Sequence, residues 1–300
     1  MKILVTGATG LVGAALVGAL GREHEVVRLT RGPKRSAADL AWSPESGVLE
    51  RTALEGLEAV VHLAGESIGG RRWNAAHKRR VHDSRVRGTH LLCEALGALE
   101  RPPRVLVSAS AIGYYGDRGD EPLDEESAPG TGFLARVARE WEEATASAGR
   151  RGIRVIRLRS GIVLAGRGGA LEPMRRLFRL GLGGPFGRGR QWVSWIALSD
   201  LVGAIAHGLG CEALHGPVNA VAPGAVIQRE FARTLARVLM RPALLPAPAF
   251  ALRLALGREM ADELLLASQR VEPRRLLATG YAFRFRALEP ALRHVLGPFA

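Results

Sequence analysis

The chain has 300 residues, of which 47% are hydrophobic, so it can bury the core of one large α/β domain or of a domain with a smaller lobe. The sequence has no apolar run of membrane-spanning length, and its N-terminus has the pattern of a strand, so we expect a soluble, cytoplasmic protein without a signal peptide. The net charge of +13 comes from scattered arginines and not from a basic stripe, which argues against a nucleic-acid binder.

The first 21 residues predict a strand, a tight turn and a helix. Residues 3–5 form an apolar run, and Gly7, Gly10 and Gly13 follow in the pattern G-x-x-G-x-x-G before an Ala/Leu/Val run of helical length. Gly7 would let the chain turn, Gly10 would let the backbone approach a diphosphate, and Gly13 would let the helix pack on the strand. The pattern therefore predicts half of a βαβ unit whose helix N-terminus holds the phosphates of a dinucleotide.

The end of the second strand indicates which dinucleotide is bound. The segment EVVRLT at 25–30 has the pattern of a strand, and Arg31 follows it, with Lys34 and Arg35 close behind and no acidic residue before Asp39. An acidic residue at this place binds the ribose of NAD, whereas an arginine suits the 2′-phosphate of NADP. We therefore expect NADP(H) as cofactor, with Arg31 as the ligand of its 2′-phosphate.

Further strands are predicted at 59–63, 105–107 and 153–158, with helical segments between them. This alternation predicts an α/β fold with a doubly wound parallel Rossmann sheet, whose ligand site lies beyond the carboxyl ends of the strands. We place the NADP-binding Rossmann domain at 1–165 and a smaller C-terminal α+β substrate lobe at 166–300.

Several local features complete the expected fold. One helix is predicted from about Phe133 to Ser147, and Ser199 and Asp200 are expected to cap the apolar helix that follows them. His62 lies inside a strand and is expected to be a packed core histidine. The glycine-rich stretches GRGGALEP and GLGGPFGRGRQWVSW are expected to be substrate-covering loops, because neither is predicted to lie between a strand and a helix.

Motifs along the whole chain point to one family. They are LAGE at 63–66, RRW at 71–73, SASAIGYYG at 108–116, GGALEPM at 168–174, GPVNAVAP at 216–223 and SQRVEPRRLLATGYAF at 268–283. With these motifs the chain resembles the atypical short-chain dehydrogenases/reductases called epimerase family proteins, or SulA-family nucleoside-diphosphate-sugar epimerases, which carry a small C-terminal domain of unknown function, here at about 245–293. The resemblance implies an NADP-binding Rossmann fold with an undefined substrate.

The residues expected at the cofactor belong to the glycine-rich turn, to the strand ends, or to positions that match the family's motifs. Arg85 is included because it lies where extended members carry the asparagine of N-x-x-G-T, and an Ala-Gly pair at a strand end lets the cofactor lie close to the backbone. The full set is Thr6, Gly7, Thr9, Gly10, Leu11, Val12, Gly13, Arg31, Leu63, Ala64, Gly65, Glu66, Arg85 and Ile162.

The chain departs from the wider superfamily at its acid–base pair. That superfamily uses a Tyr-x-x-x-Lys pair on the helix after the fifth strand, in which lysine lowers the tyrosine pKa. Neither Phe133 with Val137 nor Leu134 with Ala138 supplies the pair here, and no lysine follows Lys78. Within the family itself, alanine replaces the usual histidine in the segment WIALSD at 195–200.

The remaining candidates for chemistry are Ser110, Tyr114 and Arg85. We expect Tyr114 to donate a proton, Ser110 to orient the substrate oxygen, and Arg85 to supply the nearest positive charge, since arginine stays charged. An alternative is that Tyr114 only packs and that Ser110 only caps the strand.

Three functions remain open from the sequence. The first is an NADP(H)-dependent oxidoreductase with an unknown small-molecule substrate, the second a non-catalytic NADPH-binding sensor or partner-binding protein, and the third a sugar-nucleotide epimerase. The epimerase ranks last, because its redox cycle needs the missing pair. We expect a monomer or homodimer, no membrane contact and no metal, since Cys93 and Cys211 are far apart and no histidine has a zinc-site spacing.

Overall fold

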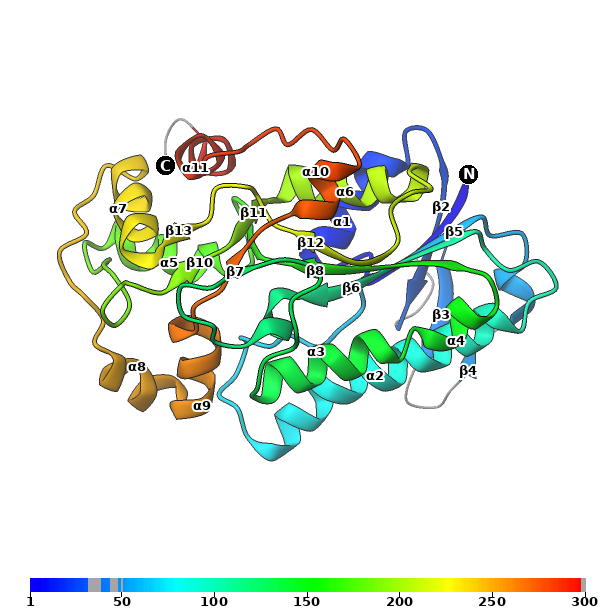
Figure 1. Ribbon diagram of the computed structural model, residues 1–300, viewed down its shortest axis with the longest axis horizontal. Helices are drawn as coiled ribbons and strands as arrows, with labels where there is room; N and C mark the ends of the chain where they lie inside the picture. Colours follow the sequence, from blue (N-terminus) through cyan, green and yellow to red (C-terminus); the bar gives the residue numbers. More distant parts are fainter. Residues whose placement is uncertain (32–38, 44–47, 50, 298–300) are drawn as a thin grey trace.

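The computed structural model describes residues 1–31, 39–43, 48, 49 and 51–297. A twisted sheet forms its centre, and helices cover both faces of that sheet (Figure 1). Across the sheet the parallel strands are β12 (Gly216–Ala220), β8 (Arg154–Ser160), β6 (Val105–Ala111), β5 (Ala59–His62), β1 (Lys2–Thr6), β2 (Glu25–Thr30) and β3 (Asp39–Ser43). The short β4 (Val48–Leu49) pairs antiparallel with β3. The chain returns to the middle of the sheet after β3, so the predicted doubly wound Rossmann fold is confirmed.

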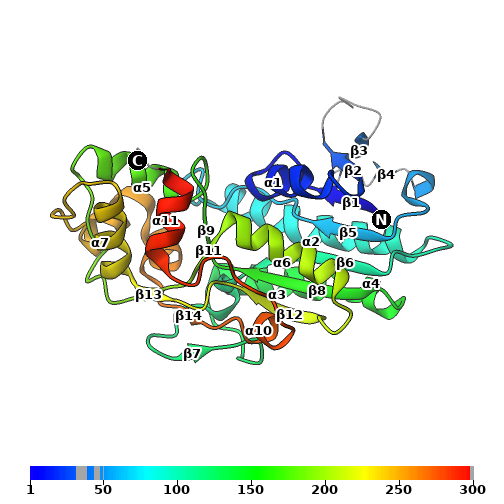
Figure 2. The same cartoon turned by 90° about the horizontal axis from the view of Figure 1, so that it is seen from above.

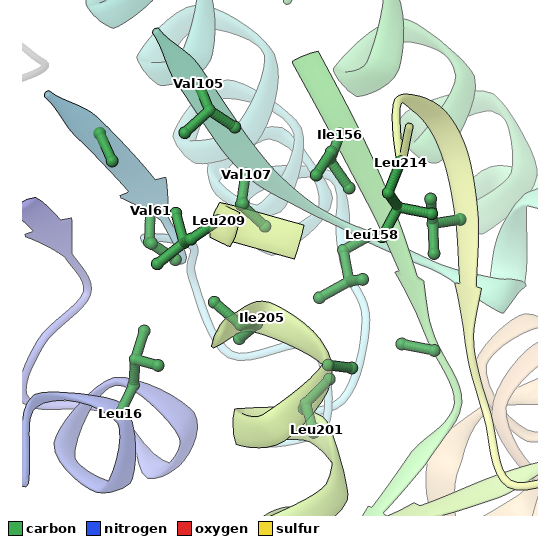
Figure 3. Packing of buried hydrophobic residues seen from close by; sticks show 14 of the residues in the cluster. Leu16, Val61, Val105, Val107, Ile156, Leu158, Leu201, Ile205, Leu209 and Leu214 are labelled. Carbon is green, nitrogen blue, oxygen red and sulfur yellow. The ribbon is translucent and has the colours of Figure 1, made fainter. Parts of the chain in front are cut away.

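Two hydrophobic cores form where the apolar faces of the helices pack on the apolar faces of the sheet. Helices α1 (Leu11–Leu20) and α6 (Leu198–Gly210) cover one face, whereas α2 (Ala75–Gly97), α3 (Phe133–Glu143) and α4 (Ala146–Arg150) lie on the other (Figures 1 and 2). In the first core, Leu16 of α1 and Ile205 of α6 pack with strand residues such as Val107 (Figure 3). Because alternate strand residues point to opposite faces, both faces of the sheet are apolar and buried.

The C-terminal helices gather at one end of the molecule, on the left in Figure 1. This end has its own core, in which Phe178, Trp195 and Phe231 are buried. Its helices are α5 (Leu171–Arg179), α7 (Gln228–Val238), α8 (Ala249–Leu256), α9 (Arg258–Ala261) and α11 (Leu288–Leu296), with a one-turn π-helix at Asp262–Leu266. Helix α10 (Arg274–Ala278) lies apart from them, beside β12 and near α6 (Figure 1), with Leu276 in the core of the central sheet. Three short strand pairs lie outside the central sheet: β9 (Ile162–Leu164) with β11 (Trp195–Ala197), β10 (Trp192–Val193) with β13 (Val226–Ile227), and β7 (Pro122–Leu123) with β14 (Arg270–Val271).

Three sequence-based expectations need correction. The boundary at residue 165 does not separate the layers, because α6 and β12, from beyond it, belong to the central sheet and its helical cover. The helix expected from Phe133 to Ser147 is divided into α3 and α4. Ser199 and Asp200 do not cap α6, since the helix begins at Leu198, before both of them.

Asp200 has a different structural role from the one expected. Its carboxylate is buried and accepts hydrogen bonds from the backbone N–H groups of Arg284 (2.7 Å) and Phe285 (3.0 Å), while the Tyr281 hydroxyl donates to its carbonyl oxygen (2.7 Å). Asp200 therefore ties the C-terminal segment to α6. No helix among the described residues is long and apolar enough to cross a membrane.

Candidate active site

The glycine-rich turn between β1 and α1 has the expected close packing. Gly7 has a φ of +65°, and a Cβ placed on it would lie 2.7 Å from the carbonyl carbon of Leu63 at the end of β5. A Cβ on Gly13 would overlap the Gly7 carbonyl oxygen, so the helix approaches the turn as predicted. Gly10 is exposed, and a Cβ there would meet only that same oxygen, at 3.3 Å. The open side of the turn is therefore at Gly10, beside the N-terminus of α1.

Thr6 connects the ends of the two central strands. Its hydroxyl oxygen accepts hydrogen bonds from the backbone N–H groups of Leu63 and Ala64 (3.1 Å each) and lies 2.7 Å from Nδ1 of His62. The other ring nitrogen of His62 lies 3.0 Å from the Thr89 hydroxyl. Burial lowers the pKa of His62 to about 4, so the ring is a neutral, packed core histidine, as predicted.

Arg85 lies beneath the loop that follows β5. It donates hydrogen bonds to the carbonyl oxygens of Glu66 (2.9 Å) and Val81 (3.2 Å), and its guanidinium lies 5.1 Å from the centre of the Trp141 ring. Burial lowers the pKa of Arg85 to about 10, although the negative charge of Glu66 acts to raise it. A Cβ on Gly65 would lie 3.2 Å from the Arg85 guanidinium carbon, so Arg85 supports this loop from below.

The other expected cofactor residues lie around the same edge. Thr9 is exposed in the glycine-rich turn, Arg31 is exposed directly after β2, and Ile162 is half-buried in β9. Lys34 and Arg35 lie outside the described residues. Asp39, the first acidic residue after the second strand, is buried and paired with Arg28 at 2.7 Å, so its carboxylate is already bound within the sheet.

The stretch GRGGALEP lies between β9 and α5, which corrects the expectation that no strand and helix flank it. Both Gly168 and Gly169 have positive φ angles, of 72° and 65°. A Cβ on Gly169 would lie 3.0 Å from the Leu11 side chain at the start of α1. The loop therefore lies against the same helix N-terminus as the glycine-rich turn.

Ser110, near the end of β6, and Tyr114, in the turn directly after β6, contact a buried ion pair. The Ser110 hydroxyl donates to Glu142 of α3 (2.7 Å), and Arg159 of β8 binds both oxygens of that carboxylate, at 2.7 and 2.8 Å. The Arg159 and Glu142 side chains are only 3% and 5% exposed. Although burial opposes it, hydrogen bonding and charge from Glu142 raise the pKa of Arg159 on balance. Arg159 thus carries a fixed positive charge.

The positive group against Tyr114 is Arg159. Its guanidinium carbon lies 3.5 Å from the centre of the Tyr114 ring, and it also donates to the Tyr115 hydroxyl (2.9 Å). The expectation that Arg85 supplies the nearest positive charge is therefore wrong, because Arg85 lies under the loop after β5. Burial raises the pKa of Tyr115 to about 12, although Arg159 opposes this.

Comparison with known proteins identifies the family. The sequence profile of the NAD dependent epimerase/dehydratase family matches residues 3–211, more than half of the chain. The chain belongs to this family. The profile of a domain of unknown function, DUF1731, matches residues 247–295, so the resemblance to the family with that C-terminal domain is confirmed.

Relatives match along almost the whole chain. Epimerase family protein ML0860 of Mycobacterium leprae is 40% identical over 293 residues, which cover 97% of this chain and 94% of that protein. Epimerase family protein SDR39U1 of Homo sapiens is 38% identical over 300 residues, which cover 99% of this chain and all of that protein. The crystal structure of human SDR39U1 (isoform2) with NADPH is similar with a TM-score of 0.90, at 37% identity and 99% coverage of both chains.

Sequence reasoning missed three side chains of this candidate site: Glu142, Arg159 and Glu263. Both oxygens of Glu263, in the π-helix, accept backbone N–H groups at the start of α3, from Phe133 at 2.8 Å and Leu134 at 2.7 Å. The strand at 154–160 reads RVIRLRS and contains Arg154 and Arg157 besides Arg159, so its sequence alone does not single out Arg159. Among the described residues, no group of three or more His, Cys, Asp or Glu side chains is placed to hold a metal ion.

Proposed function

We propose that the protein is an NADP(H)-dependent oxidoreductase of the atypical short-chain type, which works without the Tyr-x-x-x-Lys pair. The observation that carries the proposal is the turn around Gly10, whose open side faces outward at the start of α1. A Cβ would fill the space that a diphosphate needs, so the residues present fit a dinucleotide. The human relative, 37% identical and crystallised with NADPH, supports the same cofactor.

Different groups of the chain would bind different parts of the cofactor. Backbone N–H groups at Leu11 and Val12 would hold the diphosphate, and Arg31 the 2′-phosphate. Gly65, supported by Arg85, would let the cofactor lie close to the end of β5. When bound, NADPH supplies a hydride to a carbonyl or related group.

We also propose that Tyr114 delivers the proton. Its ring is half-exposed and lies on the permanently charged guanidinium of Arg159, which the buried Glu142 fixes in place. Ser110 donates its only hydroxyl hydrogen to Glu142, so orienting a substrate oxygen would require it to exchange that bond. Its role therefore remains a prediction.

Arg31→Ala should weaken NADPH binding at least about tenfold and leave NADH binding nearly unchanged, because a charge-assisted bond to phosphate contributes about 1.5–3 kcal/mol. Isothermal calorimetry with both cofactors measures this. Arg22→Ala is the matched control, since Arg22 is also exposed but lies before β2 and not after it. Equal losses for NADPH and NADH would contradict the assignment of Arg31.

The redox activity is tested by deuterium transfer from 4-deuterated NADPH to product, across carbonyl, enone and sugar-nucleotide compounds. Tyr114→Phe should lower turnover about 10²–10⁴-fold with little change in NADPH affinity, as expected for a lost general acid. If wild-type protein transfers no deuterium to any compound, the second candidate, an NADPH-binding sensor, takes its place. The absence of the Tyr-x-x-x-Lys pair favours that candidate.

A further inference from the structure

Exposed apolar side chains gather at the helical C-terminal end of the molecule. Of the ten large hydrophobic side chains exposed among the described residues, eight come from 177–254, so their exposure is not spread over the whole surface. Single exposed leucines are normal, but a cluster of them marks an interaction site. This apolar patch consists of Leu177, Leu180, Leu182, Met240, Leu244, Leu245, Phe250 and Leu254.

The segments that carry the apolar patch run side by side. The N–H of Leu245 donates to the Gly183 carbonyl oxygen (3.3 Å), and the N–H of Ala247 donates to that of Pro185 (2.9 Å). A Cβ on Gly184 would overlap the Leu245 carbonyl oxygen, which shows how closely the two loops pack. The second of these loops connects α7 to α8 along the left edge of Figure 1. The patch is therefore one surface at one end of the molecule.

Helix α8 is apolar but lies entirely on the surface. Its sequence is AFALRLAL, and none of its eight residues is buried. Phe250 and Leu254 are four positions apart, on the same face of the helix, and are 72% and 77% exposed. A helix of this composition normally buries its apolar side chains, so this face of α8 lacks a partner within the described part of the chain.

Positive charge surrounds the apolar patch. Arg179 directly precedes Leu180, and Arg241 directly follows Met240. Segments 173–190 and 228–250 contain one acidic residue, Glu230. Some arginines of this end are neutralised, by Glu172, Glu289 and Asp262. Six others are exposed and form no ion pair with a described residue: Arg179, Arg188, Arg190, Arg229, Arg233 and Arg241.

The combination of the two features decides what binds there. A second copy of this chain would cover the leucines but would bring arginine against arginine, which like-charge repulsion opposes. A nucleic acid would match the arginines but leave the leucines and Phe250 in water. A membrane of anionic lipids matches both, because its apolar interior lies directly beneath negative headgroups, and long arginine side chains reach the phosphates while apolar neighbours enter the boundary.

We propose that the helical C-terminal end binds the surface of membranes that contain anionic lipids. The apolar patch enters the boundary between headgroups and acyl chains, and the six arginines contact the lipid phosphates. The expectation of no membrane contact rested on the lack of an apolar run long enough to span a bilayer, and binding to the surface needs no such run. The proposal does not depend on the redox function.

Vesicle flotation with the full chain tests the proposal. One set of unilamellar vesicles contains phosphatidylcholine alone, and the other contains about 30% phosphatidylglycerol. We expect binding to the anionic vesicles to be at least about tenfold tighter, since each arginine near such a surface contributes favourably. Raising the salt from about 0.1 M to about 0.5 M should weaken that binding severalfold, because salt screens exposed charges.

Paired variants separate the apolar from the charged contribution. Phe250→Ser with Leu254→Ser should weaken binding to anionic vesicles about tenfold or more, through the lost apolar contact. Leu277→Ser is the matched control, since Leu277 is also exposed but lies on α10, outside the patch. All these side chains are exposed, so thermal unfolding should stay unchanged.

The charge is tested in the same way. Arg179→Gln with Arg241→Gln should weaken binding to anionic vesicles about tenfold or more and leave the weak binding to phosphatidylcholine unchanged. Arg22→Gln, an exposed arginine after α1, is the control and should have little effect.

Four results would overturn the proposal. They are no binding to anionic vesicles, equal binding to both vesicle types, unchanged binding of the Phe250→Ser, Leu254→Ser variant, and unchanged binding of the Arg179→Gln, Arg241→Gln variant. Analytical ultracentrifugation adds the competing case. If the protein ignores vesicles and forms dimers that the Phe250→Ser, Leu254→Ser variant does not form, the patch is an interface between two copies of the chain instead.

Discussion

Replacing Gly10 by valine should abolish NADPH binding in a protein that still folds. Gly10 has the extended conformation φ −76°, ψ 173°, which valine readily adopts, and its Cβ would meet only one carbonyl oxygen, at 3.3 Å. The branched side chain would instead fill the open side of the turn and keep phosphates from the N–H groups of α1. We expect at least about a hundredfold loss, or about 2.7 kcal/mol, measured by calorimetry beside thermal unfolding.

Gly13→Val is the matched control, three residues along the same turn. Its Cβ would overlap the Gly7 carbonyl oxygen, and backbone atoms cannot move away cheaply. This variant should lose stability, by about 1–3 kcal/mol or more as in other overpacked sites, whether or not cofactor is present. If Gly10→Val kept its NADPH affinity, the turn would not be the phosphate site.

The central sheet could be predicted because its signals are local. Apolar runs such as 3–5 and 59–63 mark buried strands, and the glycine spacing marks the turn to α1. The two-residue strands β7, β10, β13 and β14 could not be predicted, since tertiary pairing alone defines them. The helix start at Leu198 was missed because Ser199 and Asp200 resemble a cap, whereas Asp200 bonds to residues more than 80 positions away.

The candidate site divides in the same way. Local sequence signals are enough to predict the residues that lie in the glycine-rich turn, Gly7, Gly10 and Gly13, and the residue directly after the second strand, Arg31. Glu263 could not be expected at the start of α3, because 130 residues separate it from Phe133. Ser110 lies beside Arg159 because β6 pairs with β8, and this pairing is a property of the assembled sheet. The sequence alone therefore does not show that Arg159, and not Arg85, is the charged group beside Tyr114.

The Arg159–Glu142 pair gives the second large expected effect. Arg159→Met should destabilise the protein by about 3–5 kcal/mol, because it leaves the Glu142 carboxylate buried without a partner. Arg159→Met combined with Glu142→Leu should recover most of that loss, since apolar replacements of a buried pair are often neutral or stabilising. Urea unfolding followed by circular dichroism measures both variants.

The double variant also tests whether the Arg159–Glu142 pair acts on proton donation by Tyr114 or only on the stability of the fold. It removes the charge that lies 3.5 Å from the Tyr114 ring centre and replaces both members of the ion pair with apolar side chains. If Arg159 fixes Tyr114 for proton donation, the folded double variant should bind NADPH normally and lose turnover about as far as Tyr114→Phe, by about 10²–10⁴-fold. Full turnover in a stable double variant would leave the ion pair a purely structural element. A single Arg159→Met variant as stable as wild type would instead show that Glu142 finds another partner or a proton when the guanidinium is removed.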